Sequence, residues 1–152
     1  MSLASGCSGT ELVVHAVNKM LAFWQKLFGI SIECRHSYAR ENVGFKQEWI
    51  GARFSPDRTY VDLLELAASS AKDTSGNKAT IKQVTVWFCG IERDSISGLN
   101  KGRAENYDSA GANGAATSIG ATAQACMAYI ARHTPPLDVL ENARSLAVIC
   151  LS

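Results

Sequence analysis

The clearest pattern in the chain is the helical spacing of apolar residues over residues 10–28. Apolar side chains recur there at steps of three and four, which places them on one helical face: Val13, Val17, Met20, Leu21, Trp24, Leu27 and Phe28. Ser8 and Glu11 have the spacing of a capping box. Gly29 occupies the position at which glycine commonly relieves left-handed strain after a helix. We therefore predict a helix over residues 10–28.

Three further helices are predicted along the chain. Ser55, Pro56 and Asp57 supply a capping hydroxyl, a proline at the first helical position and an acid in the first turn. Helical apolar spacing continues from there through residues 56–72. It recurs over residues 117–132, where small side chains would let another backbone approach closely, and over residues 137–151 after a pair of prolines.

Strands are indicated by alternation and by β-branched or aromatic residues. Residues 30–34 alternate between apolar and polar, residues 45–54 suit two strand faces, and residues 80–89 are rich in strand-forming residues. The polar residues 35–44 are typical of a loop. Because strands and helices alternate only in part, we do not expect a doubly wound parallel sheet. The expected fold class is α+β: one helix-rich domain over residues 1–152, with about four helices and a small two- or three-stranded sheet.

Composition excludes several classes of protein. Fifteen Lys and Arg residues balance fourteen Asp and Glu residues, which argues against nonspecific binding of nucleic acid and against attachment to an anionic membrane. No apolar run reaches the roughly 18 residues that span a bilayer, and the first residues do not resemble a secretory signal. The five cysteines are widely spaced without a CxxC motif, so we expect reduced cysteines that act mostly as core residues in a cytoplasmic protein.

Three residues are candidates for catalysis. His15 lies four residues after Glu11, so that a carboxylate could orient a general base, although ordinary pairing on a solvated helix face explains this spacing better. Cys34 and His36 lie two residues apart and would share one face of an extended segment, as a nucleophile and base or as a metal pair. The simpler interpretation is one buried cysteine and one surface histidine. No complete catalytic constellation is evident, and whether the chain is an enzyme stays open.

Two segments have the composition of a ligand-binding surface. Basic residues within 35–58 are interleaved with Tyr38, Phe45 and Trp49, a mixture that can stack bases and hold phosphates. The acids among them cancel more than half of the charge, which favours a solvated face. Residues 111–114 resemble in outline an anion-binding loop before a helix, but lack the P-loop lysine and spacing. Whether residues 35–58 and 102–116 line a pocket or an interface is left open.

One family resemblance is carried by three short stretches: residues 21–30, residues 63–66, and residues 83–87 with Gly90, Ile91 and Glu92 after them. They resemble parts of the vicinal-oxygen-chelate superfamily, which includes glyoxalase-like and resistance proteins. The resemblance implies a metal-dependent enzyme or a small-ligand-binding protein. It would make Glu65 a metal ligand and would put Gln83 in the place of a usual histidine.

The function that the sequence favours is binding or self-association. Small side chains over residues 117–132 suit close packing of helices, and residues 146–151 stay apolar up to the last positions. We therefore expect a homo-oligomer or a protein partner, with no cofactor, no metal, no membrane and no nucleic acid. A metal-dependent enzyme or small-ligand-binding protein of the vicinal-oxygen-chelate kind is the alternative.

Overall fold

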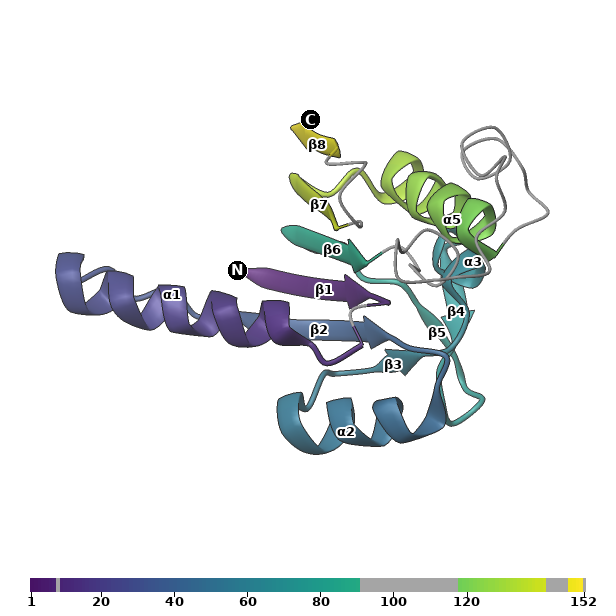
Figure 1. The fold of residues 1–152 in the computed structure, drawn as a ribbon, viewed down its shortest axis with the longest axis horizontal. Coiled ribbons are helices and arrows are strands. Elements are labelled where there is room, and N and C mark those ends of the chain that lie inside the picture. Colours follow the sequence, from purple (N-terminus) through teal and green to yellow (C-terminus); the bar gives the residue numbers. More distant parts are fainter. Residues whose placement is uncertain (8, 91–117, 142–147, 152) are drawn as a thin grey trace, which may run out of the picture.

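The computed structural model describes residues 1–7, 9–90, 118–141 and 148–151. Its centre is a six-stranded sheet with the strand order β3-β2-β1-β6-β7-β8 (Figure 1). Neighbouring strands from β3 through β7 pair in parallel, and β8 pairs with β7 antiparallel. The strands of this sheet are β1 (Ser2–Gly6), β2 (Arg35–Arg40), β3 (Thr59–Tyr60), β6 (Val86–Gly90), β7 (Leu137–Glu141) and β8 (Val148–Leu151).

Four helices and a small hairpin complete the described part of the chain. The helices are α1 (Leu12–Phe28), α2 (Gly44–Phe54), α3 (Leu63–Leu66) and α5 (Ser118–His133). The strands β4 (Ser70–Lys72) and β5 (Lys78–Thr80) pair antiparallel in a separate two-stranded sheet. The chain therefore alternates between strands and helices around a mainly parallel sheet.

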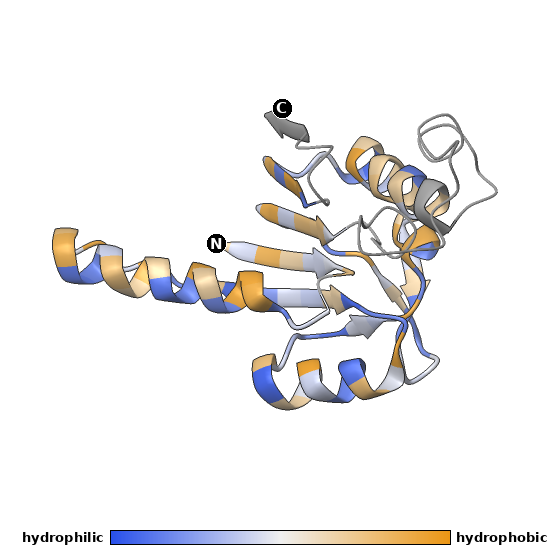
Figure 2. Cartoon of the chain, viewed as in Figure 1, coloured by the Kyte–Doolittle hydropathy of each residue, from blue (hydrophilic) through white to orange (hydrophobic). Residues whose placement is uncertain are grey.

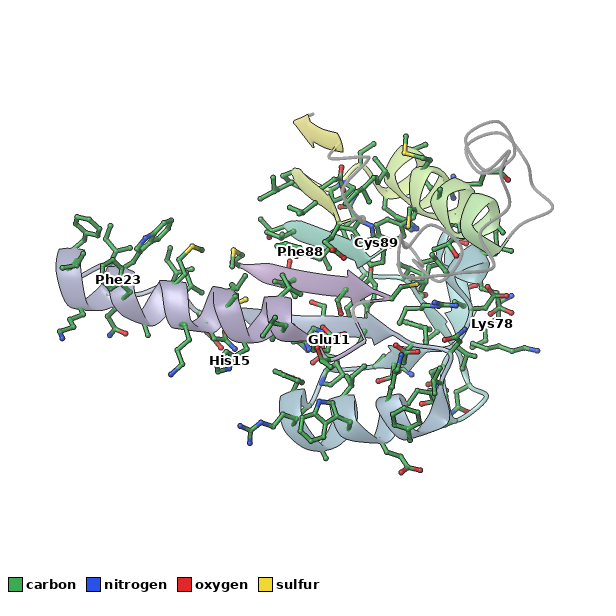
Figure 3. The ribbon with its side chains drawn as sticks, viewed as in Figure 1. Glu11, His15, Phe23, Lys78, Phe88 and Cys89 are labelled. Atoms are coloured by element: carbon green, nitrogen blue, oxygen red, sulfur yellow. The ribbon has the colours of Figure 1, made fainter. Side chains whose placement is uncertain are left out.

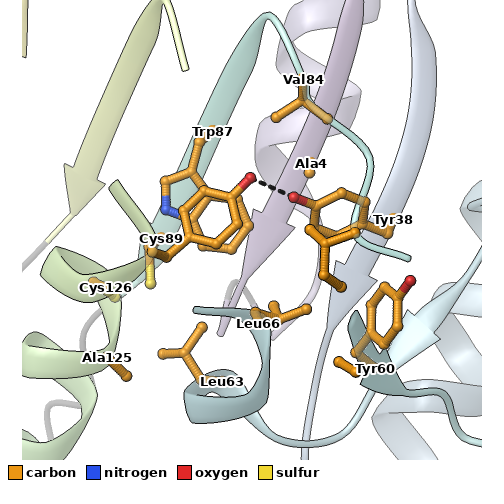
Figure 4. Close-up of a cluster of buried hydrophobic side chains, with 13 residues drawn as sticks. Ala4, Tyr38, Tyr60, Leu63, Leu66, Val84, Trp87, Cys89, Ala125 and Cys126 are labelled. Atoms are coloured by element: carbon orange, nitrogen blue, oxygen red, sulfur yellow. Dashed lines mark hydrogen bonds between the residues drawn. The ribbon is translucent and has the colours of Figure 1, made fainter. Parts of the chain in front are cut away.

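The two faces of the sheet are buried in two separate apolar clusters. Leu3 and Ala4 follow each other in β1 and therefore point to opposite faces. Leu3 packs with Val14, Val17 and Leu21 of α1. Ala4 belongs to the larger cluster, which draws on α3, the hairpin, β6 and α5 (Figure 4): Tyr38, Tyr60, Leu63, Leu66, Ala71, Ile81, Val84, Trp87, Cys89, Ala125, Cys126 and Tyr129. The sheet thus lies between α1 on one face and α3 with α5 on the other.

An aromatic stack organises the larger cluster. The rings of Trp87 and Tyr129 stack with centroids 4.0 Å apart, and the hydroxyl groups of Tyr38 and Tyr129 share a hydrogen bond (Figure 4). His133 lies against Tyr129, and its Nε2 is 2.8 Å from the carbonyl oxygen of Leu66. This set ties β2 and β6 to α3 and α5, so it fixes both sides of the sheet's centre.

The expected α+β class with a two- or three-stranded sheet is wrong. The five parallel strands form a mixed α/β arrangement, with more strand content than the pattern indicated. Strands of a parallel sheet are covered on both faces, so they lack the alternation of a half-exposed strand. β1 (SLASG) and β2 (RHSYAR) are short and contain small or polar residues, so no apolar period marks them, although four residues of each strand are buried. The vicinal-oxygen-chelate resemblance expects the end of a metal-binding strand at residues 63–66. The chain forms the helix α3 there instead.

Several predicted elements are replaced by others. The strand expected at residues 30–34 begins later, at Arg35, inside the expected loop. The strand expected at 45–54 is the helix α2, and the helix expected at 56–72 contains β3, α3 and β4. The helix expected at 137–151 contains β7 and β8.

The two long helices are confirmed. α1 and α5 coincide closely with residues 10–28 and 117–132, and Gly29 ends α1 with φ at 68° and its N–H donating to the Gln25 carbonyl. The predicted capping box is wrong, because the N-cap residue of α1 is Glu11 and not Ser8. Ser8 itself lies outside the described residues. Residues 80–89 overlap β6.

Candidate functional site

The carboxyl edge of the sheet contains a point where the strand order changes direction. From β1 the chain passes to β2 and β3 on one side, whereas β6 and β7 lie on the other side. The helices α1 and α5, which come after β1 and β6 in the described chain, lie on opposite faces of the sheet. In open parallel sheets, ligands bind in the crevice at this switch point, outside the carboxyl ends of the strands.

A glycine-rich turn connects β1 to α1 at this edge. Cys7, Gly9 and Glu11 all have positive φ angles of 54°, 65° and 53°, so the chain reverses tightly into the helix. Gly6 packs against Trp87, since a Cβ at Gly6 would lie 2.8 Å from a ring atom of that tryptophan. The first N–H groups of a helix lack partners inside the helix. α1 therefore begins at this switch point, and a helix N-terminus is a place that suits an anionic group.

The end of β6 approaches this turn equally closely. A Cβ at Gly90 would lie 2.8 Å from the carbonyl oxygen of Cys7. Because this neighbour is a backbone atom, only a glycine fits here without a shift of one strand. The two central strands therefore end in glycines, which let Trp87 and the end of β6 pack closely against the turn after β1.

A buried carboxylate follows β2 at the same edge. Glu41 is 3% exposed, and its Oε1 accepts the backbone N–H groups of Asn42 and Val43 at 3.0 Å each. The Gln47 side chain donates to the Glu41 carbonyl at 2.7 Å. In dinucleotide-binding domains, an acid at this position hydrogen-bonds a ribose hydroxyl. The fixed geometry of Glu41 suits that role.

Arg40 ties three strand ends together beneath the crevice. Its Nε donates to the carbonyl of Val61 at 2.9 Å, and its Nη1 lies 2.6 Å from the Cys7 sulfur. The pKa of Cys7 is lowered, chiefly by a hydrogen bond from the Cys89 thiol and also by the Arg40 charge, against the opposing effects of burial and of Glu41. Cys7 therefore has more thiolate character than an ordinary cysteine.

A buried polar cluster supports the start of α1 from inside. The Ser5 hydroxyl donates to Glu11 Oε1 at 2.7 Å, and His36 Nε2 lies 3.4 Å from that hydroxyl and 3.9 Å from Glu11 Oε2. Glu11 is fully buried. Burial lowers the pKa of His36 to about 4, so the imidazole is neutral at pH 7. The cluster joins β1 and β2 to the turn and thereby positions it.

The three residues that the sequence offered as candidates for catalysis lie in different parts of the fold. Cys34 and His36 line the same cavity of about 380 Å³ between α1 and the end of α2, and burial raises the pKa of Cys34. His36 is buried, which the surface interpretation did not expect. His15 is exposed on α1, away from the carboxylate of Glu11, which turns into the interior (Figure 3). The structure therefore brings Cys34 and His36 together and leaves His15 apart.

Glu65 does not lie at a strand end. It is half-buried in α3, where its Oε2 accepts the backbone N–H of Lys72 at 2.8 Å. Within residues 1–7, 9–90, 118–141 and 148–151, no group of three or more His, Cys, Asp or Glu side chains is placed to hold a metal ion. The geometry of Glu65 is that of a residue that fastens α3 to β4.

Two of the five basic residues within 35–58, Arg35 and Arg58, form ion pairs with acids. Arg35 and Lys82 both contact Asp57, at 2.7 and 3.3 Å, and Arg58 lies 2.6 Å from Asp73. These pairs support the solvated-face interpretation over a phosphate-binding surface. Residues 102–116, including the glycine turn at 111–114, lie outside the described residues.

The residues of the crevice were missed at the level of sequence. Residues 2–6 were not recognised as a strand, because their side chains are small and the run is short. If residues 2–6 had been recognised as a strand, the glycines that follow would have indicated a strand–glycine turn–helix unit, and Glu41 would have been seen to follow the next strand.

None of the helices that the structure describes has both the length and the apolar character that crossing a bilayer requires.

The comparisons with known proteins give one relative of stated activity. No family model matches the chain. The chain is 27% identical over 143 residues to DNA (cytosine-5-)-methyltransferase DMT5 of Cryptococcus neoformans var. grubii. The similarity covers 93% of this chain but 6% of that much longer protein. The chain is thus similar, over nearly its whole length, to a small part of a methyltransferase.

Proposed function

We propose that this chain is the cofactor-binding part of a methyltransferase and binds S-adenosylmethionine at the carboxyl edge of its sheet. The observation that carries the proposal is the buried Glu41 carboxylate after β2, at the same edge as the glycine turn after β1. The topology supports it, because the crevice lies where the strand order reverses. The similarity to a DNA (cytosine-5-)-methyltransferase supports methyl transfer as the chemistry.

The residues present fit an adenosyl group. Glu41 would accept hydrogen bonds from the ribose hydroxyls, and the glycines at the ends of β1 and β6 hold the turn after β1 close to the end of β6. The turn at residues 6–10 and the first N–H groups of α1 would face the carboxylate of the methionine moiety. When bound, the cofactor supplies a methyl group on a positively charged sulfur. The chain itself binds and orients that group.

We propose cytosine in DNA as the methyl acceptor of the whole enzyme, on the relative's name alone. For this chain we retain the expectation that it does not itself hold DNA by phosphate contacts. Its net charge is +1, and two of its arginines, Arg35 and Arg58, are paired with acids. The cytoplasmic location also stays a prediction.

Calorimetric titration with S-adenosylhomocysteine, the demethylated form of the cofactor, tests the proposal. Glu41→Gln keeps the oxygen that accepts the Asn42 and Val43 N–H groups but removes the charge. We expect it to weaken binding about tenfold or more, which corresponds to about 1.4 kcal/mol. Glu33→Gln is the matched control, because Glu33 is exposed before the other end of β2, and its affinity should equal that of the wild type. Equal affinities for all three chains, or no binding while NAD or ATP binds, would contradict the proposal.

Self-association is the second candidate function, and the surface of α1 favours it. The final turns of α1 extend beyond the sheet (Figure 2) and carry exposed apolar side chains: Met20 at 44%, Phe23 at 56%, Leu27 at 55% and Phe28 at 65% exposure. An apolar helix face of this kind suits a second copy of the chain. This surface differs from the segments 117–132 and 146–151 that suggested self-association in the sequence.

Light scattering coupled to size-exclusion chromatography distinguishes the possibilities. We expect the wild type to be a dimer at micromolar concentration and Phe23→Ser with Leu27→Ser to be a monomer. Leu64→Ser is the control, because Leu64 is 59% exposed on α3. A wild type that stays monomeric at high concentration would rule this candidate out without affecting the cofactor proposal.

A further inference from the structure

Three cysteines from distant parts of the sequence meet beside the glycine turn. Cys89 at the end of β6 and Cys126 in α5 are buried side by side in the larger apolar cluster (Figure 4). Cys7 is half-buried in the turn after β1 and packs against the same cluster. All three are free thiols. A row of thiols therefore runs from the interior to the rim of the candidate site.

Cys7 has the surroundings of a reactive cysteine. The Arg40 guanidinium lies 2.6 Å from its sulfur, and a charge-assisted contact of this kind stabilises the thiolate. The charged and titratable groups that act on the Cys7 thiol are Arg40, Glu41 and Cys89, and the combined effect lowers its pKa. Cys34 is equally half-buried, but burial raises its pKa. Cys7 is thus distinguished from Cys34 by its partners rather than by its exposure.

Cys89 is placed to react with an oxidised Cys7. It lies directly opposite Gly6 in the pairing of β1 with β6. Its sulfur is 3.3 Å from the position that a Cβ on Gly6 would take, so it points toward β1. The neighbouring residue Cys7 is then roughly 6 Å from Cys89 between Cα atoms, from the spacings within and between strands, which falls inside the range of disulfides. The pKa of Cys89 lies well above its ordinary value, so Cys89 keeps its proton until Cys7 has reacted.

We propose that Cys7 and Cys89 form a reversible disulfide when the chain meets hydrogen peroxide. In the first step the Cys7 thiolate attacks one peroxide oxygen, which breaks the O–O bond and gives a sulfenic acid and hydroxide. In the second step the Cys89 sulfur attacks the Cys7 sulfur, and the sulfenic oxygen leaves as water with the thiol proton. Peroxide is reduced by two electrons and the two thiols are oxidised to one disulfide. A thiol reductant reverses the reaction.

The bond would act directly on the candidate site. It would fasten the glycine turn to the end of β6, across the point where ligands enter such sheets. It would also remove the sulfur contact of Arg40, the residue that connects the ends of β1, β2 and β3. The inference does not depend on which ligand the crevice takes.

Peptide mapping of the reduced chain after treatment with hydrogen peroxide at pH 7 tests the proposal. We expect a cross-linked peptide containing Cys7 and Cys89, a loss of about 2 Da from the intact mass as two hydrogens leave, and full reversal by dithiothreitol. Cys34→Ser is the matched control and should form the same link at the same rate. A link between Cys89 and Cys126 instead, or no link while Cys34 oxidises first, would overturn the proposal.

Two variants separate the steps. In Cys89→Ser, or in Cys89→Ala if the serine variant is unstable, Cys7 should stop at the sulfenic acid, which dimedone traps. Arg40→Gln should slow the alkylation of Cys7 by iodoacetamide at pH 7 by about tenfold, since the nearby positive charge is lost. Circular dichroism confirms that each variant is folded. Alkylation of Cys7 at an unchanged rate in folded Arg40→Gln would contradict the assigned role of Arg40.

Discussion

At the scale of single residues, burial decides the charge of His36. Its imidazole lies beneath α1 beside Ser5 and Glu11, and the loss of hydration lowers its pKa to about 4. A hydrogen bond with the Tyr38 backbone and the charge of Asp57 favour the charged form and raise the pKa, but they act against the larger effect of burial. The native protein therefore contains a neutral histidine in contact with a buried carboxylate.

The neutral His36 makes the stability depend on pH. The unfolded chain binds a proton at this residue below about pH 6.5, whereas the folded chain does so only near pH 4. The stabilisation is therefore complete above pH 6.5 and is lost as the pH falls toward 4. Between pH 7 and pH 5 we expect the free energy of unfolding in urea to fall by about 2 kcal/mol from this group. His36→Gln should remove that part of the pH dependence, and an identical dependence in both chains would contradict the explanation.

At the scale of elements, long amphipathic helices were predictable and short buried strands were not. One face of α1 and one face of α5 pack against the sheet, so apolar residues recur with the helical period in both segments. This spacing can be seen directly in the sequence. β7 at residues 137–141 has the sequence LDVLE, which mixes apolar and acidic residues and has no regular period. α2 has a weaker pattern, and its Phe45 and Trp49 are exposed at 70% and 53%. Which of these segments becomes a strand depends on partners far away in the sequence, such as β6 for β7.

The same dependence on distant partners limited how much of the candidate site could be predicted from the sequence. Cys34 and His36 were noted because reactive residue types stood close together. Glu41 and Gly90 are ordinary until β1, β2 and β6 are aligned side by side. Their importance lies in the position that the sheet gives them at its carboxyl edge.

The close approach of β6 to the glycine turn predicts a pair of opposite effects. Gly90→Ala should lower the free energy of unfolding by about 1–3 kcal/mol, because the new Cβ would lie 2.8 Å from the Cys7 carbonyl and a strand end must shift. Gly51→Ala is the control, because it lies in α2 with nothing within 4 Å of its Cβ position. Alanine should stabilise that helix by up to about 1 kcal/mol. Urea unfolding checks both, and a stable Gly90→Ala chain would show that the strand ends are not in tight contact.

At the scale of the whole molecule, the candidate site lies between the two packed layers. The turn after β1 rests on the Ser5, Glu11 and His36 cluster on the α1 side. The end of β6 rests on Trp87 and Tyr129 on the α5 side. A ligand at the switch point would contact loops that belong to both layers. Its binding would therefore stabilise the fold as a unit rather than one loop.

That arrangement predicts a cooperative response to the cofactor. S-adenosylhomocysteine at one hundred times its dissociation constant should stabilise the chain by about 2.7 kcal/mol, which raises the midpoint of thermal unfolding by roughly 5–10 °C for a chain of this length. It should also slow the alkylation of Cys7, which lies in the covered turn, but not that of Cys34, which lies in the cavity under α1. Glu41→Gln should reduce both effects together at the same ligand concentration. A thermal shift without protection of Cys7 would place the ligand elsewhere on the molecule, and protection of Cys34 alone would point to the cavity beside His36.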